Sequence, residues 1–315
     1  MSLMALERMK KFIFKILSFI LISVLLFLAV CYQVDGYSDS FYINFTTPKQ
    51  SSLILGTSRA AQGLQPKIFD AILKKQFSNY SFTVLHSPFG ETYLNSIKKK
   101  IDTNTKQGIF IIAVDPWSLS SFTKSPEDSL SFREIPLALG NTKVVNIKPN
   151  PFYLMNNRGQ RIYDLIIDKQ SNFFLHDDGW LEVNIALDSL KEEDVDKKIK
   201  TYRKGMLRKA QFSKTRLTYL LKTINFLNVY GDVYLVRLPI HEKMMNIDNA
   251  VMAHFNDDIK EAIALSKGYL DLTPMNKDFH YTDGNHLHKT SGKIVSNIIA
   301  NWIDKTRQAH VKELY

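Results

Sequence analysis

The chain has 315 residues, which is enough to bury a full hydrophobic core in one large domain. Its hydrophobic content of 45% is typical of a folded protein. Lysine and arginine outnumber aspartate and glutamate by 41 to 31, but this basic excess is scattered along the chain. Because no groove-binding motif accompanies the charge, we expect no nucleic-acid partner, and an anionic membrane surface or polymer is the better match.

The N-terminal residues predict a membrane anchor. Basic residues precede an uninterrupted apolar run from Ile16 to Tyr32, which with its flanks is long enough to cross a bilayer core. The first charge after the run is Asp35, so the positive-inside rule keeps residues 1–12 in the cytoplasm, places the transmembrane segment at 13–33 and puts the remainder outside, in the periplasm or at the cell surface. A cleaved signal peptide is the alternative, although no A-x-A-like site follows.

The rest of the chain divides into a tether and one domain. Cys31 is the only cysteine, so the external part has no disulfide bond and depends on its hydrophobic core. Residues 34–50 are polar and aromatic, which predicts a tether. A folded domain is expected at 51–310.

Short apolar runs alternate with helical patterns in this domain. The expected strands are Ser52 to Leu55, Phe82 to Leu85, Ile109 to Val114, Val233 to Leu238 and, with a weaker signal, Gly268 to Leu272; helices are expected at Pro66 to Phe77 and Thr92 to Ile101. This alternation predicts an α/β fold, a three-layer sandwich with a mainly parallel central sheet. The rhythm breaks at about 116–216, where an insertion is expected to cap the C-terminal edge of the sheet.

The stretch GTSR, with Ser58, follows the first expected strand. Ligands of an open parallel sheet gather where strands end and the following helices begin. A serine at such a turn exposes its hydroxyl, and its own N–H can stabilise an oxyanion. A serine here is also a common helix N-cap, so this motif alone does not identify a site.

A second motif near the C-terminus complements the first. Asp283 and His286 lie three residues apart in the loop DGNHL. The carboxylate can hold one ring nitrogen while the other ring nitrogen faces a serine hydroxyl, which is the arrangement of a catalytic triad.

Together these motifs resemble the SGNH (GDSL-like) hydrolase superfamily over residues 51–305. The resemblance implies a flavodoxin-like fold in which Ser58 is the nucleophile, His286 the general base and Asp283 its orienting carboxylate. The segment HSPFGETYLN matches the block that supplies a glycine N–H, so Gly90 joins the Ser58 N–H in the oxyanion hole.

One block departs from the family pattern. Where the superfamily has a G-x-N-D asparagine, this chain has Asp115 after the third strand. Either the two backbone donors suffice, or a group from the insertion completes the oxyanion hole. The segments around Trp117 and Arg237 are similar to those of membrane-anchored envelope proteins that work beside multi-pass O-acyltransferases. In such proteins the serine passes an acyl group to or from a polymer hydroxyl.

Several other residues have two interpretations. Arg59, Asp115, Trp117 and Arg237 are candidate substrate-binding residues, with packing or ion pairing as the alternative. His280 and His288, near Asp283 and His286, could suggest a metal site, but the D-x-x-H pairing already accounts for two of the four. His241 and Glu242 are interpreted as loop residues. No glycine pattern fits a dinucleotide or phosphate loop, so neither a cofactor nor a metal is expected.

The sequence therefore predicts an extracytoplasmic serine esterase or O-acyltransferase that modifies an envelope polysaccharide through an acyl-serine intermediate. Water as the acceptor would make it an esterase, and a sugar hydroxyl would make it a transferase. The alternative is a non-catalytic module that keeps this fold to bind polymer or to scaffold a multi-pass membrane O-acyltransferase.

Overall fold

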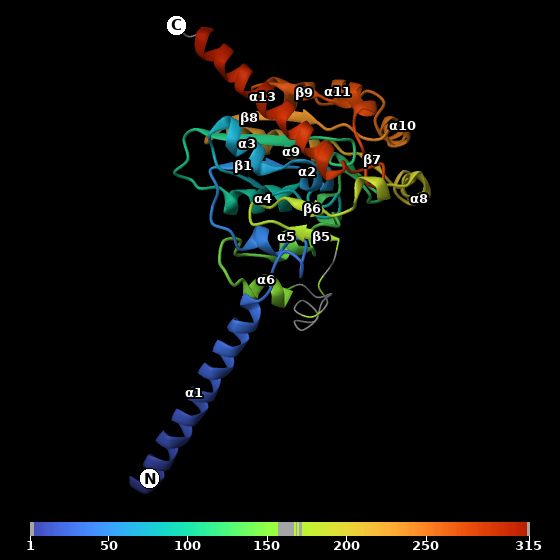
Figure 1. Ribbon diagram of the computed structural model, residues 1–315. Coiled ribbons are helices and arrows are strands. Elements are labelled where there is room, and N and C mark those ends of the chain that lie inside the picture. The colour runs from blue at the N-terminus through green and yellow to red at the C-terminus, as the bar shows by residue number, and fades with distance from the viewer. Residues whose placement is uncertain (1–2, 157–166, 168, 170–171, 314–315) are drawn as a thin grey trace.

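The computed structural model describes residues 3–156, 167, 169 and 172–313. Its centre is a five-stranded parallel sheet in the order β2-β1-β3-β8-β9 (Figure 1). The strands of this sheet are β1 (Ser52–Leu55), β2 (Phe77–Asn79), β3 (Gly108–Ala113), β8 (Gly231–Arg237) and β9 (Tyr269–Asp271). The fold is therefore α/β, as the alternation of strand and helix patterns predicts.

Helices cover both faces of the sheet because successive side chains of a strand point to opposite faces. Leu53 and Leu55 pack in one hydrophobic core with α4 (Glu91–Lys100), α9 (Lys214–Asn228) and α12 (Lys260–Leu265). Ile54, between them, packs in a second core with the other helices. These are α2 (Ser58–Gly63), α3 (Pro66–Leu73) and α13 (Lys289–Glu313).

Two predicted elements differ from the observed ones. The run Phe82 to Leu85 is not a strand; β2 lies earlier, and its last pair, Ile54 with Asn79, comes where β1 is about to end. Without a partner strand, Phe82 packs instead in a cluster of aromatic rings. Helix α3 ends at Leu73 because Lys74 adopts a left-handed conformation with φ of 55°.

The N-terminal helix α1 (Leu3–Tyr32) projects away from the domain, at the end opposite to α13 (Figure 1). Among the described residues it is the one helix long and apolar enough to cross a membrane, a test that a signal sequence near an N-terminus would also satisfy.

The predicted tether is wrong for much of residues 34–50. A 3-10 helix, Tyr42–Phe45, is buried, and both Tyr42 and Phe45 belong to the core that contains α4 and α9. The aromatic side chains explain the difference, because burying their large rings in a core stabilises the fold more than leaving them exposed in a tether.

The expected insertion, 116–216, packs against the protein at two separate places. Its described elements include β4 (Ser120–Ser121), α5 (Ala138–Asn141), α6 (Pro151–Asn156), β5 (Phe173–Leu175), β6 (Leu181–Val183), α8 (Glu192–Thr201) and β7 (Gln211–Phe212). Helix α8 packs near α10 (Glu242–Val251), beside the ends of the strands, whereas α6 contacts α1. Residues 157–166, 168 and 170–171 of the insertion lie outside the described residues. The short helix α11 (Phe255–Asp258) completes the fold.

Candidate active site

Ser58 is the first residue of α2, immediately after the turn that ends β1. The turn needs a glycine: Gly56 has φ of 154°, and a Cβ there would lie 2.9 Å from the Cβ of Ala60 and 3.0 Å from that of Ala113. This close approach packs α2 against β3. The Ser58 side chain consequently starts at the carboxyl edge of the sheet and remains partly exposed.

Ser58, His286 and Asp283 form a continuous hydrogen-bonded relay. Ser58 Oγ lies 2.8 Å from His286 Nε2, and His286 Nδ1 lies 2.9 Å from Asp283 Oδ1 and 3.0 Å from Asp283 Oδ2. An ionised carboxylate only accepts hydrogen bonds, so Nδ1 carries the imidazole proton and Nε2 is free to accept the hydroxyl proton. The two motifs, more than two hundred residues apart in sequence, meet with the geometry of a nucleophile, a base and an orienting acid.

The loop around His286 is shaped by the same carboxylate. Asp283 Oδ1 accepts the backbone N–H groups of Asn285 and His286, each at 3.0 Å. Gly284 has φ of 80°, a left-handed conformation that glycine adopts without strain. Asp283 thus fixes both the backbone that carries the imidazole and the imidazole itself.

Lys198, from α8 of the insertion, forms an ion pair with Asp283 at 2.8 Å. Burial alone would raise the pKa of Asp283, but the charge and hydrogen bond of His286, together with Lys198, outweigh it and hold that pKa well below its usual range. Asp283 therefore remains ionised whenever His286 has to be oriented. No sequence signal distinguished Lys198 from the other charges of its helix.

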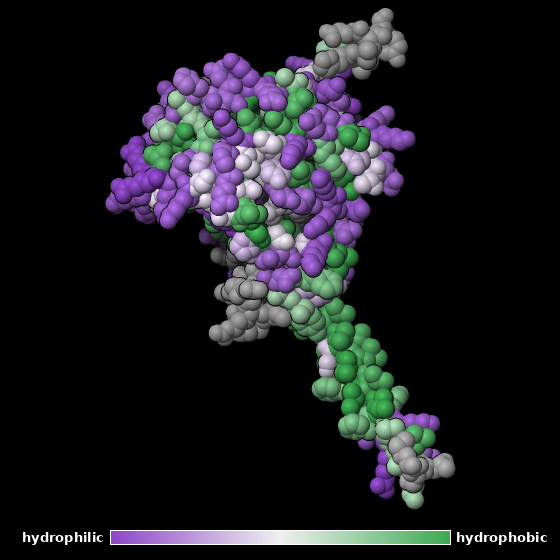
Figure 2. Space-filling model, turned by 180° about the vertical axis from the view of Figure 1, so that it is seen from behind, coloured by the Kyte–Doolittle hydropathy of each residue, from purple (hydrophilic) through white to green (hydrophobic). Residues whose placement is uncertain are grey.

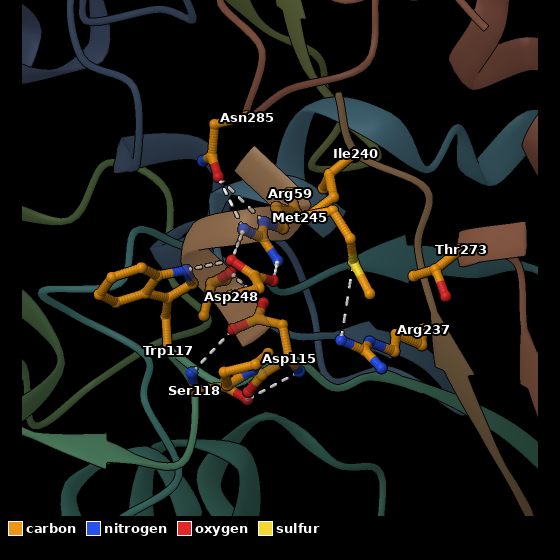
Figure 3. Close-up of polar contacts among 12 residues, drawn as sticks. Arg59, Asp115, Trp117, Ser118, Arg237, Ile240, Met245, Asp248, Thr273 and Asn285 are labelled. Atoms are coloured by element: carbon orange, nitrogen blue, oxygen red, sulfur yellow. Dashed lines mark hydrogen bonds and ion pairs between the residues drawn. The ribbon is translucent and has the colours of Figure 1, made fainter. Parts of the chain in front are cut away.

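Arg59, the residue after Ser58, is buried and fully engaged by the protein (Figure 3). Its guanidinium makes a bidentate ion pair with Asp248 at 2.7 and 2.9 Å, and donates to Asn285 Oδ1 at 3.0 and 2.9 Å. Asp248 Oδ1 also accepts from Trp117 Nε1 at 2.7 Å. The ion-pair interpretation of Arg59 therefore holds, and its substrate-binding role is corrected.

The other three candidate substrate-binding residues are buried as well. Asp115 accepts from Thr57 Oγ1 at 3.1 Å and from the Ser118 N–H at 2.8 Å. Trp117 is 2% exposed, which leaves no ring face for a sugar. Arg237 contacts the Phe255 ring, with its Cζ 4.5 Å from the ring centroid, and lies 3.8 Å from Asp271. These residues support the edge of the sheet and do not offer a binding surface.

Gly90 is the N-cap of α4, so its N–H lies at a helix start, as the N–H of Ser58 does. Directly against it lies a buried ion pair, Arg216 with Glu134, at 2.6 Å. A Cβ at Gly90 would lie 2.8 Å from Glu134 Oε1 and 2.9 Å from Arg216 Nη1. Arg216 Nη1 also donates to the Phe89 carbonyl at 3.1 Å. The glycine is therefore required by this packing, whether or not its N–H serves an oxyanion.

The two other histidines considered for a metal site, His280 and His288, are joined through the backbone, with the His288 N–H donating to the His280 carbonyl at 2.9 Å, and His280 is exposed. His288 Nδ1 pairs with Thr290 Oγ1 at 2.8 Å, and its Nε2 pairs with the Ile185 carbonyl at 2.9 Å. Among the residues that the structure describes, no three His, Cys, Asp or Glu side chains converge as metal ligands would. His241 is the N-cap of α10, and the neighbouring Glu242 pairs with Lys277.

No protein-family model matches this chain, and no curated protein matches it.

Five residues at the site were missed by sequence reasoning: Asp248, Asn285, Glu134, Arg216 and Lys198. Asn285 was visible inside the DGNHL motif, because it lies between Gly284 and His286. The others come from α10, the insertion and α9, and their separation in sequence gave no signal.

Proposed function

We propose that this protein is a membrane-anchored serine esterase or O-acyltransferase of the SGNH type that acts on an acylated envelope polysaccharide. The observation that carries the proposal is the relay in which Ser58 Oγ, His286 and Asp283 are joined at 2.8 and 2.9 Å. The strand order β2-β1-β3-β8-β9 supports it, since it matches the order of flavodoxin-like folds, in which ligands bind at the ends of the strands.

The relay accounts for acyl transfer in two steps. Ser58 Oγ attacks the ester carbonyl while its proton passes to His286 Nε2, and the carbonyl electrons move to the oxygen. The N–H groups of Ser58 and Gly90, both at helix starts, are the proposed donors to this oxyanion. When the intermediate collapses, the bond to the alcohol breaks, and the alkoxide takes the proton from Nε2. Water or a sugar hydroxyl then attacks the acyl-Ser58 with the same proton movements in reverse.

The proposed anchoring is supported by α1, which has the length and apolar composition of a membrane span. Basic residues before the span favour a cytoplasmic N-terminus, which puts the domain outside. An envelope polymer, and a multi-pass O-acyltransferase that delivers the acyl group, are the partners that this setting proposes.

Labelling of the full chain with a fluorophosphonate tests the proposal. The unmodified protein should become labelled, and Ser58→Ala should abolish the label. His286→Gln should slow labelling by roughly 10³-fold or more, because the hydroxyl loses its base. If a chelator abolishes hydrolysis of the ester and Ser58→Ala retains it, the protein would instead be a metal hydrolase.

A scaffolding function is the second candidate. It is favoured by Asp115, which stands where the superfamily has an asparagine donor and is committed to Thr57 and Ser118. Folded protein that no fluorophosphonate labels, yet that co-purifies with a multi-pass acyltransferase, would support this candidate and contradict the catalytic one.

A further inference from the structure

The surface around the exit of α1 exposes apolar and aromatic side chains. Phe152 and Met155 on α6 are 52% and 67% exposed, and Tyr32 and Tyr37, at and after the helix end, are 63% and 42% exposed. Figure 2 shows the hydrophobic surface of α1 running up to the base of the domain. We call these four residues the apolar collar.

Helix α1 is joined to the domain without a loose linker. Cys31, in its last turn, is fully buried in the domain core, and its carbonyl accepts a hydrogen bond from Tyr42 Oη at 3.4 Å. Tyr42 in turn accepts the N–H of Asn150, directly before α6. The collar therefore keeps a fixed position relative to the helix.

The length of the apolar run brings the bilayer to the collar. Residues 16–32 span about 26 Å as a helix, at about 1.5 Å per residue, against a hydrocarbon core of about 30 Å. The run has no length to spare, so the bilayer reaches the base of the domain, where Phe27 already packs against the domain core. Cys31, the residue before Tyr32, is already fully buried in the domain.

We infer that the apolar collar rests in the interfacial layer of the bilayer on the side where α1 leaves it. Tyrosine and other amphipathic aromatic rings favour this layer. Lys148 Nζ lies 5.7 Å from the Tyr32 ring centroid, where it can meet an anionic headgroup. The inference rests on the proposed anchoring by α1, and it adds that the domain is held against the lipid in one orientation, with Ser58 at a fixed height.

Quenching by brominated lipids tests the collar in the full chain, reconstituted in vesicles. In Phe152→Trp, an exposed aromatic replaces another, and the emission of the unmodified protein is subtracted. Ile294→Trp is the matched control, since Ile294 is also 52% exposed but lies on α13, away from α1 (Figure 1). The tryptophan at position 152 is expected to lie about 5–10 Å deep in the interfacial layer. Lipids brominated near the headgroups should therefore quench about half of its added emission and leave the emission of the control variant unchanged.

Equal quenching of the two variants in vesicle-bound protein would overturn the collar while leaving the anchor intact. Protein that fails to float with vesicles would instead overturn the anchoring itself.

A second inference comes from Asn285, whose side-chain amide is oriented without ambiguity. Its Oδ1 accepts two hydrogen bonds from Arg59, so its NH₂ group must point the other way. That group lies 3.1 Å from His286 Nε2, the same nitrogen that faces Ser58 Oγ. Asn285 is buried, and its partner Arg59 is held by Asp248.

Two donors therefore converge on one lone pair. In the resting site the hydroxyl of Ser58 and the amide of Asn285 share Nε2. Once Nε2 takes the serine proton, it becomes a donor and the Asn285 N–H loses its acceptor. At that moment a new negative charge forms on the substrate oxygen.

We propose that Asn285 donates to this oxyanion, as a side-chain donor released by the proton transfer itself. This proposal deepens the function proposed above and rests on it. Arg59 is then a positioning residue, because it holds the amide by its oxygen and keeps the NH₂ group on the side of Ser58.

Phosphonylation kinetics of the full chain test this role, since the phosphonyl oxygen occupies the oxyanion position. Asn285→Asp keeps an oxygen for Arg59 but removes the donor, so the maximal labelling rate should fall by about 100-fold with little change in the half-saturating probe concentration. Asn285→Ala should fall similarly, and melting temperatures show whether each variant is folded. An Asn285→Asp rate equal to that of the unmodified chain would overturn the donor role, whereas an unmodified chain that never labels would overturn the proposed function.

Discussion

Two of the three proposed oxyanion donors, the N–H groups of Ser58 and Gly90, lie at separate helix starts, and each lies beside a buried arginine–carboxylate pair. On the Ser58 side, defined by residues 57–59, 248 and 283–286, Arg59 pairs with Asp248 at 2.7 Å. On the Gly90 side, defined by residues 86–90, 134 and 216, Arg216 pairs with Glu134 at 2.6 Å.

The pairs differ in what they hold. Arg59 holds a side chain, Asn285, which contacts the proton-accepting nitrogen of His286. Arg216 instead packs against backbone, at Phe89 and Gly90, which is independently tied by the hydrogen bond from the Phe89 N–H to the Ser118 carbonyl at 3.0 Å. The same interaction thus positions a functional group on one flank and supports a loop on the other.

The largest effects should come from breaking either ion pair. Asp248→Asn and Glu134→Gln each remove the ion-paired carboxylate of a buried guanidinium, which should lower the free energy of unfolding by about 3–5 kcal/mol. Chemical denaturation of the full chain in detergent measures this loss. A variant within 1 kcal/mol of the parent would contradict the buried-pair assignment.

Replacing whole pairs separates the two flanks. Apolar replacement of both partners should recover part of the stability in each case. Arg216→Met with Glu134→Leu should still label with a fluorophosphonate, because the Gly90 loop keeps its other backbone contact. Arg59→Met with Asp248→Leu should label slowly, since nothing then orients Asn285. Equal labelling rates for the two double variants would contradict the inference that only the Arg59 pair positions a group at the site.

Acid should lower the free energy of unfolding through His86, which lies on the Gly90 side. Burial, and then the charge of Arg133, lower the pKa of His86 to about 4, against about 6.5 in the unfolded chain. Between these values the unfolded chain binds more protons, so the free energy of unfolding falls as the pH is lowered, by up to about 3 kcal/mol. His86→Gln does not titrate and should show a shallower loss between pH 6.5 and 4. Parallel curves for the two proteins would exclude His86 as the cause.

Gly90→Ala should have a smaller effect. The added methyl group meets Glu134 and Arg216 at under 3 Å, and such overpacking costs about 1–3 kcal/mol. Gly205→Ala is the control, since a Cβ there has no heavy atom within 4 Å. Comparison of the two melting temperatures checks the prediction, which fails if both variants behave alike.

Lys198→Met should have the smallest effect on stability. The pair with Asp283 is partly exposed, with side chains 31% and 25% accessible, so its loss should cost less than about 1 kcal/mol. Labelling of Ser58 should slow, by less than about tenfold, because Asp283 loses the positive charge of Lys198. Lys197→Met, whose ion pair with Asp194 lies at the surface, should leave the labelling rate unchanged.

Local patterns in the sequence predicted a good part of this protein. Apolar runs placed β1, β3 and β8 nearly as observed, because a buried parallel strand needs a continuous hydrophobic stretch. The spacing of Asp283 and His286 predicted their contact, since a loop that contains a glycine can bring a carboxylate back to an imidazole three residues later. The apolar run at the N-terminus predicted α1 by length alone.

Other features depended on partners that only folding brings together. The position of β2 depends on its pairing with β1, which ends beside it. The burial of Tyr42 depends on the core that it joins. Arg59 had two interpretations until Asp248, 189 positions away, was placed against it. The reason is physical: a strand or a membrane helix is determined by residues adjacent in sequence, whereas the orientation of Asn285 depends on charges contributed by α2 and α10, and that arrangement exists only in the folded chain.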